Sequence, residues 1–599
     1  MTASFGRRLL PAVVVAALAA AYAFAADEVN SSAAPAAAQP AAPAAVQQAP
    51  APPAAPAAVQ QAPAPPAAPV AVISQKLEGI VLVKDPKDIV KSGVSGFKGL
   101  RADQFPAIES DLDFRDHLKE YLGKPFAEAE RAKLVNELIS FFQRGGKPVV
   151  DVTTPPQDVT AGVLQVLVIQ GKLSSVKVEG NRWFRSEQVS DQFRNRAGED
   201  IDSKTLADDL DWVNRNPFRR VDLVFVKGSE LGKTDVVLRE ADAFPVRVYG
   251  GYEDSGTQLT RNDRFLAGAS WGNVFGRDGQ LNYQYIFSPE EKYFRAHSGL
   301  FVQPLPWRHT LSIYGGYAST VGRVPEPFSL TGFSWQTGMR YEVPLPRLSF
   351  ADFRHSLVAG FDFKRSNNNL AFGGSSVFGE TVDIAEWSAG YNMSFKDPFG
   401  ASSVRATYVY SPGGITAADR TAIYDAARSG SRADFNYGKI ELNRTTGLPF
   451  DFSLVNLLTF QFSNNNLQAS EQLGFGGYDT IRGFDTRVFN ADRGCLLTGE
   501  LRAPAFSLLS MMGLRSLSEK LGGDRLQFLG FADYGAGGSV ARLPGEANQT
   551  RMLGAGPGLR YAIASNLQVR ADYGWQVIND AQPVRKYTAR THVGVTLSF

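Results

Sequence analysis

An alternation of apolar and polar residues with a period of two runs from about Phe244 to Phe599. Successive side chains of a β-strand point to opposite faces, so this period predicts strands with one apolar and one polar face. Helical periodicity is nearly absent from the same region. We therefore expect an all-β domain. The alternating sets are Val246/Val248/Gly250/Tyr252, Leu281/Tyr283/Tyr285/Phe287, Leu311/Ile313/Gly315/Tyr317, Leu357/Ala359/Phe361/Phe363, Val404/Ala406/Tyr408/Tyr410 and Leu567/Val569/Ala571/Tyr573/Trp575.

A soluble β-sandwich would show the same alternation, and three features favour a transmembrane barrel instead. The polar stretches Arg365–Gly374 and Ser411–Gly438 have the length of barrel surface loops. The chain ends in alternating apolar residues that finish on Phe599, which resembles the last-strand signature of bacterial outer-membrane barrels. If the region forms sixteen antiparallel strands, each strand and its connection have about 22 residues. This is enough, because one membrane-spanning strand takes about 9–11 residues.

The N-terminus has the pattern of a secretory signal peptide. Two arginines precede the apolar run Leu9–Ala20, and Ala23-Phe24-Ala25 offers small residues at the positions that a signal peptidase reads. We expect residues 1–25 to be the signal, cut after Ala25 or Ala26. A membrane anchor is the weaker interpretation, because the apolar run is shorter than the roughly 20 residues that span a bilayer.

Residues 26–72 are rich in Ala, Pro and Gln, and a proline-containing segment occurs twice, at Ala41–Pro53 and at Ala54–Pro66. These residues lack the large apolar side chains of a core, and proline favours extended polyproline II. The segment is predicted to be a semi-rigid tether.

Two consecutive β-α-α-β-β units are predicted between the tether and the all-β region, over residues 73–171 and 172–243. The first unit is expected to contain strands Leu77–Val83, Pro148–Val152 and Val163–Ile169 and helices Phe114–Leu122 and Phe126–Phe142. The second is expected to contain strands Val176–Glu179, Val221–Val226 and Thr234–Arg239 and helices Ser186–Arg194 and Ser203–Asn214, with Ser203 as N-cap. The whole chain is thus an α+β region followed by an all-β barrel.

A tether, two such units and a C-terminal barrel resemble the outer-membrane transporters of two-partner secretion, the haemolysin- and adhesin-secreting relatives of the barrel-assembly insertases. The small units would be their periplasmic POTRA domains. Ile481-Arg482-Gly483-Phe484 is similar to the family's [VI]-R-G-[YF] tip of a re-entrant pore loop, here around 474–492. Phe531-Ala532-Asp533-Tyr534-Gly535 is similar to its F-x-D-x-G strand, and Asn216–Val221 is similar to an N-P-[FL]-R-x-V segment.

These motifs predict one contact. In the strand, Asp533 takes the opposite face from Ala532 and Tyr534, so its carboxylate should point into the lumen. Arginine offers planar, bidentate donors to such a carboxylate. We therefore expect Arg482 to dock on Asp533 and hold the loop inside the barrel, with Phe531 and Gly535 on the same wall. Leu529 and Phe531 are apolar on the supposed lumen face, which this assignment leaves unexplained.

Composition and motifs argue against several other functions. A net charge of +2 lacks the basic excess of a nucleic-acid-binding protein. Cys495 is the only cysteine and the five histidines are isolated, so no metal site, cofactor or catalytic residue is expected. Gly228–Thr234 is one residue short of a phosphate loop and is predicted to be a hairpin turn.

The resemblance implies an outer-membrane protein with periplasmic POTRA domains. It would capture an unfolded, cytolysin- or adhesin-like exoprotein and export it without ATP. Further expected partners are outer-membrane lipid and the barrel-assembly machinery, for which Phe599 would be the assembly signal. Exposed sheet edges near Val163–Ile169 and Val221–Val226 are candidate capture sites. The tether offers no ordinary helix to plug the pore. The alternative is an assembly factor that inserts other barrels; a passive porin would leave the POTRA units unexplained.

Overall fold

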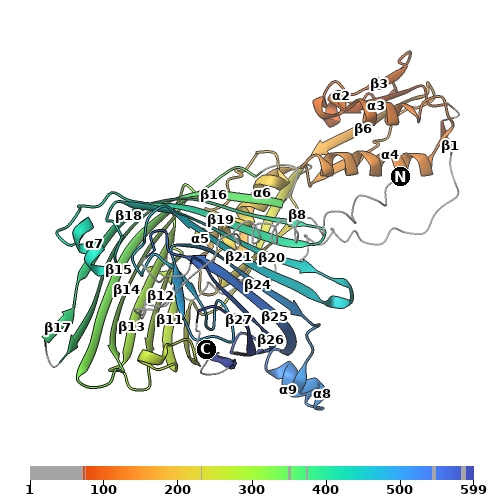
Figure 1. Cartoon of the computed structure of the whole chain (residues 1–599). Coiled ribbons are helices and arrows are strands. Elements are labelled where there is room, and N and C mark those ends of the chain that lie inside the picture. Colours follow the sequence, from red (N-terminus) through yellow and green to blue (C-terminus); the bar gives the residue numbers. More distant parts are fainter. Residues whose placement is uncertain are drawn as a thin grey trace. The chain divides into compact units, whose positions relative to one another are not determined.

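The computed structural model describes residues 72–74, 76–230, 232–347, 352–372, 375–542, 548–581 and 588–599 (Figure 1). The predicted signal peptide and nearly all of the predicted tether lie outside these residues. The described chain forms two compact units. One comprises Val246–Trp271 and Gly279–Phe599, and the other comprises the described residues up to Pro245 together with Gly272–Asp278.

The first sheet of the smaller unit is four-stranded, in the order β3-β2-β6-β5. Leu134, Leu138 and Phe142 of helix α4 are buried against it, at the three- and four-residue spacing that one helix face requires. Strand β6 pairs with β2 and with β5, so Val163–Ile169 is an interior strand and its predicted role as a free edge is wrong. The elements are β1 (Val72–Ser74), β2 (Gly79–Val83), η1 (Pro86–Asp88), β3 (Gly99–Arg101), α2 (Pro106–Ser110), α3 (Leu112–Lys119), β4 (Phe126–Ala127), α4 (Glu128–Arg144), β5 (Val150–Thr153) and β6 (Val163–Gln170).

The second sheet has the order β7-β9-β8 and packs against helix α6 through a second apolar core. The N-cap of α6 is Asp202 and not the predicted Ser203, because the Asp202 carboxylate accepts the Thr205 backbone N–H at 2.8 Å. Strands β8 and β9 are antiparallel neighbours, so the segment that resembles a phosphate loop is a hairpin connection. The elements are β7 (Lys172–Glu179), α5 (Ser186–Ser190), α6 (Ser203–Val213), β8 (Arg219–Lys227) and β9 (Lys233–Asp242).

The larger unit is a closed antiparallel barrel, which confirms the predicted fold class. Sixteen strands among the described residues close it, with β10 pairing to β28 and the short β17 (Ser375–Phe378) extending the β16–β18 hairpin. The closing strands are β10 (Val246–Glu253), β11 (Arg264–Val274), β12 (Gly279–Phe287), β13 (Phe294–Pro304), β14 (Thr310–Gly322), β15 (Phe328–Pro344), β16 (Asp352–Phe372), β18 (Thr381–Asp397), β19 (Gly400–Ser411), β20 (Phe435–Gly447), β21 (Ser453–Ser463), β24 (Arg493–Arg502), β25 (Asp524–Gly538), β26 (Thr550–Ile563), β27 (Leu567–Asn579) and β28 (Ala589–Ser598). Two short helical turns, η2 (Gln258–Thr260) and η3 (Pro449–Asp451), lie in its connections.

One predicted surface loop is a strand and the other is a loop. Strand β16 continues to Phe372, so the predicted loop Arg365–Gly374 is wrong over most of its length. Its polar residues misled the prediction because they pair across the ladder, as Arg365 does with Asp383. The connection after β19 is a long loop and contains helix α7 (Thr421–Ala427).

Two long connections interrupt the barrel ladder near its C-terminal third. Between β21 and β24 the chain forms a loop with its own short hairpin, β22 (Leu473–Phe475) and β23 (Phe489–Ala491). Between β24 and β25 it forms two short helices, α8 (Leu508–Met511) and α9 (Arg515–Lys520). Among the described residues, the helices are all too short or too polar to cross a membrane.

Candidate functional site

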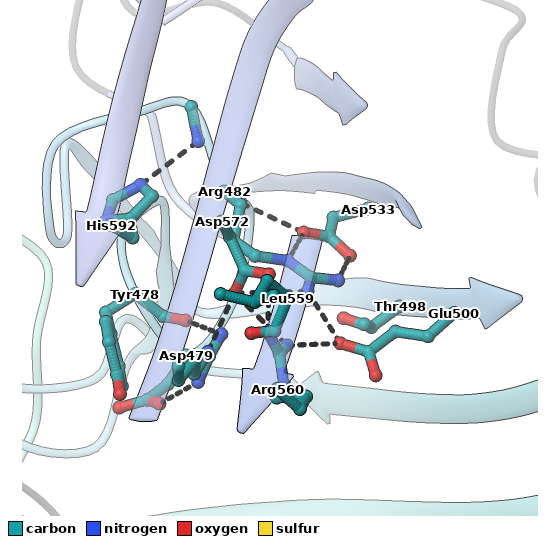
Figure 2. Close-up of polar contacts among 12 residues, drawn as sticks. Tyr478, Asp479, Arg482, Thr498, Glu500, Asp533, Leu559, Arg560, Asp572 and His592 are labelled. Carbon is teal, nitrogen blue, oxygen red and sulfur yellow. Dashed lines mark hydrogen bonds and ion pairs between the residues drawn. The ribbon is translucent and has the colours of Figure 1, made fainter. Parts of the chain in front are cut away.

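The guanidinium group of Arg482 is the centre of a buried ionic cluster (Figure 2). Its Nε donates to Asp533 Oδ2 at 2.7 Å, and its Nη2 donates to Asp533 Oδ1 at 2.8 Å. The backbone N–H of Arg482 donates to the same carboxylate at 3.0 Å. The two side chains are 2% and 0% exposed. The structure therefore brings the loop tip and strand β25 together in the planar, bidentate geometry that the sequence suggests.

Two further carboxylates from the wall surround this guanidinium. Nη1 of Arg482 donates to Glu500 Oε1 at 2.6 Å and lies 3.6 Å from Asp572 Oδ2. Arg560 links these two acids, donating to Asp572 at 2.7 Å and to Glu500 at 3.0 Å (Figure 2). Buried charges are tolerated only when they are paired, so these groups stabilise one another. The remaining basic partners of these acids are Arg502 and Arg570.

Phe531 supplies an aromatic surface for the same guanidinium. The Cζ atom of Arg482 lies 3.7 Å from the centre of the Phe531 ring, within cation–π range. Leu529, Phe531 and Asp533 are buried whereas Phe528 on the other face is 52% exposed, so the odd-numbered residues of this stretch face the lumen. The apolar character of Phe531 at a lumen position is thereby explained.

Gly483 fixes the backbone of the loop tip against the wall. Its N–H donates to His592 Nε2 at 3.1 Å, and its carbonyl accepts from Gln576 Nε2 at 2.8 Å. Its φ of +94° lies in the left-handed region that favours glycine. A Cβ at this position would lie 2.8 Å from the carbonyl oxygen of Gly574, so the approach of the two backbones requires a residue without a side chain.

Glycines of the wall provide the floor on which the loop tip lies. A Cβ on Gly554 would lie 1.9 Å from the Arg482 carbonyl oxygen, and one on Gly535 would lie 2.5 Å from Ile481 Cδ1. Gly535 therefore makes room for the loop. Ile481 and Phe484 are both fully buried. They belong to an apolar cluster with Leu473, Phe475, Ala491, Leu496 and Met552.

Asp492 holds the base of the same loop. Its carboxylate accepts from both terminal nitrogens of Arg428, at 2.7 and 3.0 Å, and from the backbone N–H groups of Leu467 and Val540 at 3.0 and 3.1 Å. Arg428 follows helix α7 directly in sequence. The re-entrant loop is thus fixed at two points, its tip on the wall strands and its base on the α7 connection.

The Asn216–Val221 segment forms a second polar cluster, inside the smaller unit. Asn216 Nδ2 donates to Asp278 Oδ1 and Arg219 Nη2 donates to Asp278 Oδ2, each at 2.7 Å. Arg219 also lies over the Phe184 ring at 4.9 Å. These contacts bind the residues around the β8 N-terminus to the segment Gly272–Asp278 of the same unit.

The remaining singled-out residues have structural positions. The Phe599 N–H donates to the Val248 carbonyl at 2.9 Å, which extends the ladder that closes the barrel, and its side chain is 74% exposed. Cys495 is a partly buried free thiol in β24. Within the part of the chain that the structure describes, His, Cys, Asp and Glu side chains do not gather into a group that could hold a metal ion.

Sequence reasoning missed the wall residues Glu500, Arg560, Asp572, Gln576 and His592. Each is a polar residue in a strand that otherwise alternates, and this alternation was the available signal for a lumen position. Alternation cannot show which lumen residues of four different strands meet, because that depends on the register and closure of the barrel.

The fold and this cluster define a class: an outer-membrane β-barrel in which a long loop is fixed inside by an arginine at its tip. A family model described as haemolysin secretion/activation protein ShlB/FhaC/HecB matches residues 232–561, more than half of the chain. The chain belongs to this family. The resemblance to two-partner secretion transporters and the outer-membrane location, both expected from the sequence, are confirmed.

Similar proteins include the outer membrane transporter CdiB of Dickeya dadantii, 22% identical over 385 residues that cover 63% of this chain and 66% of that protein. The haemolysin transporter protein ShlB of Serratia marcescens is 24% identical over 431 residues, covering 70% and 72%. Among solved structures, CdiB from Escherichia coli has a TM-score of 0.67 at 15% identity and covers 91% of this chain and 92% of its own. The match to the Dickeya protein thus spans slightly less than two thirds of its length.

Proposed function

We propose that this protein is an outer-membrane translocation pore that captures an unfolded exoprotein in the periplasm and exports it without ATP. Family membership carries this proposal. The relatives in Dickeya and Serratia are named as transporters. Residues 73–171 and 172–243 would be periplasmic POTRA domains, and residues 244–599 the barrel. Outer-membrane lipid would surround that barrel, and the barrel-assembly machinery would insert it, with Phe599 as the signal.

Capture is proposed to occur by strand addition at β8. This strand pairs only with β9 among the described residues, and the ladder between them has no register shift. Val226, near its end, is 44% exposed. The opposite edge, β7, has a register shift between Leu173 and Val176, and such irregularities weaken an edge as a template. Main-chain hydrogen bonds from β8 would hold an extended segment with little dependence on its side chains.

The locked loop is proposed to shape the conduit. Arg482 and Asp533 fix its tip inside the barrel, so the space available to a threading chain depends on this contact. No ATP is expected outside the inner membrane, so folding of the exported chain on the far side would drive net transport. The exported protein would be cytolysin- or adhesin-like.

The decisive experiment is a clean deletion of this protein in its own bacterium, with the medium compared with that of the wild type for the loss of a large exoprotein. Export should be lost while the amounts of other outer-membrane barrels stay unchanged. Plasmid-borne wild-type protein should restore export. A general loss of outer-membrane proteins would contradict the proposal and assign the chain to barrel assembly.

Strand capture has a test of its own. A photo-crosslinking residue at Val226 should trap the unfolded exoprotein, and one at Val166 in the interior strand β6 should not. Equal trapping at both positions, or none at Val226, would refute capture at β8.

A further inference from the structure

The connection between β24 and β25 differs from others at the same end of the barrel. It runs from Ala503 to Gly523 and contains α8 and α9, whereas the connection Pro398-Phe399 is a minimal turn. Val246 and Phe599 lie at this end. The end is periplasmic, because the chain enters β10 from the region proposed to be periplasmic. Short periplasmic turns are the rule in outer-membrane barrels, so this connection requires an explanation.

Asp524 fixes the connection to the outer face of the wall. It lies at an even position of β25, as do Phe528 and Gly530, which point away from the lumen. Its carboxylate accepts from Ser518 Oγ at 2.6 Å and from the Leu509 N–H at 3.0 Å, and it also binds Ser507 Oγ. The two helices are therefore attached on the lipid side of the strand.

The apolar contacts of the segment lead to the same conclusion. Leu526 is 7% exposed, although Phe528, two residues further along the same face, is 52% exposed. Helix α8 packs against β25, and Phe506 exchanges backbone hydrogen bonds with Leu526. The Phe506 ring lies 6.2 Å from that of Phe528. The segment is thus continuous with the lipid-facing surface of the barrel.

The segment carries several apolar side chains that the rest of the described chain leaves uncovered. Leu514, Leu517 and Leu521 have the spacing of one helix face, while Arg515 and Glu519 pair with each other at 3.0 Å on another. Soluble surfaces rarely carry so many exposed apolar side chains together. The exposed apolar residues are Phe506 (37%), Met511 (70%), Met512 (64%), Leu514 (43%), Leu517 (42%) and Leu521 (42%).

Aromatic side chains at the same end mark the level of the membrane surface. Trp307, Phe399 and Phe450 lie in or next to turns at this end and are 58%, 67% and 89% exposed. Barrels carry such aromatic girdles where lipid headgroups meet the acyl chains. Figure 1 shows α8 and α9 projecting outward from the wall beside β25 and β26.

We propose that the α8–α9 segment, residues 506–521, is an interfacial amphipathic segment whose apolar side lies in the periplasmic leaflet of the outer membrane. Its ligand is the phospholipid bilayer surface. The polar side, with Arg515, Glu519 and Lys520, faces the headgroups and water. Amphipathic helices of this kind bury their apolar face about 5–10 Å into the boundary between headgroups and acyl chains. The α8–α9 segment would fix the depth and tilt of the barrel in the membrane next to β25, the strand whose Asp533 binds Arg482.

The test measures the depth of a fluorescent label on the full-length protein in phospholipid vesicles. In a Cys495→Ala background, Met512→Cys carries the label. Leu501→Cys, on the exposed side of β24, is the lipid-facing control, and Leu112→Cys, exposed on α3 of the smaller unit, is the aqueous control. Nitroxide groups on lipids, either high or low on the acyl chain, act as quenchers.

We expect lipid quenching at Met512, stronger from the high nitroxide and corresponding to a depth of about 5–10 Å. Quenching should be absent at Leu112. A label at Met512 as free of quenching as that at Leu112 would overturn the proposal. Shielding of the label from aqueous iodide that appears only at high protein concentration would also overturn the proposal, because the face would then bind a second copy of the protein. Shielding that appears only on addition of the exoprotein would overturn it as well, because the face would then bind the exported chain.

Discussion

Arg482 and Asp533 share two parallel hydrogen bonds of 2.8 and 2.7 Å between a loop tip and a barrel strand, and both are inaccessible to solvent. Removing one member of such a buried pair costs about 3–5 kcal/mol, because the other charge is left uncompensated. We predict that Arg482→Ala strongly reduces export while the barrel remains folded. Arg482→Lys should restore little, since an ammonium cannot make the bidentate contact.

The measurement is the amount of exoprotein in the medium, together with protease sensitivity of the loop around 474–492. Arg502→Ala is the matched control, because Arg502 binds the same Glu500 from outside the loop and is 30% exposed. Export at the wild-type level in Arg482→Ala would show that the loop lock is dispensable.

A second prediction concerns the space beneath the loop tip. Gly483→Ala introduces a Cβ that meets the backbone of Gly574 at 2.8 Å and a positive φ that alanine disfavours. We expect about 1–3 kcal/mol of strain from the backbone alone, and hence displacement of the tip. Gly530→Ala is the control, because a Cβ there meets nothing within 4 Å. The yield of crosslinking between cysteines placed at Phe484 and Gln576 should fall in Gly483→Ala and not in Gly530→Ala. An equal yield in the two variants would contradict the prediction.

A third prediction separates the base of the loop from its tip. Asp492→Ala removes the carboxylate that joins Arg428 to the backbone of Leu467 and Val540. Hydrogen exchange of α7 and of residues near 467 should accelerate, whereas exchange at Arg482 should change little because the Asp533 contact is intact. Arg432→Ala provides the comparison, since its ion pair with Asp434 is largely exposed. Faster exchange at both ends would mean that the loop moves as one body.

Local patterns in the sequence were sufficient for the barrel. The Arg482–Asp533 contact also needed the family resemblance, which marked Arg482 as a loop tip and the strand of Asp533 as its wall. Alternation then placed Asp533 on the lumen face, and arginine chemistry made the pairing plausible. Only one of the two segments predicted to be sheet edges is an edge. Val163–Ile169 and Val221–Val226 are both apolar runs, and only strand order shows that the first is interior. The α8–α9 connection was missed because its short apolar pattern cannot be distinguished from a strand without its neighbours.

The last prediction concerns Glu240 in β9 of the smaller unit. Burial raises the pKa of this carboxyl from 4.5 to about 7, although the charge of Arg219 acts in the opposite direction. Both of its oxygens lack a hydrogen-bond partner among the described residues. A raised pKa means that the folded unit binds the proton more tightly than the unfolded chain does. The stability contributed by the neutral form is complete below pH 4.5 and is lost as pH rises to about 7.

Above that pH, Glu240→Gln should raise the local unfolding free energy by up to about 3 kcal/mol and remove most of this pH dependence. Hydrogen exchange of β9 in the full-length protein measures both effects. Glu230→Gln is the matched control because Glu230 is exposed at the β8–β9 connection. An unchanged pH profile in Glu240→Gln would show that Glu240 is not the titrating group.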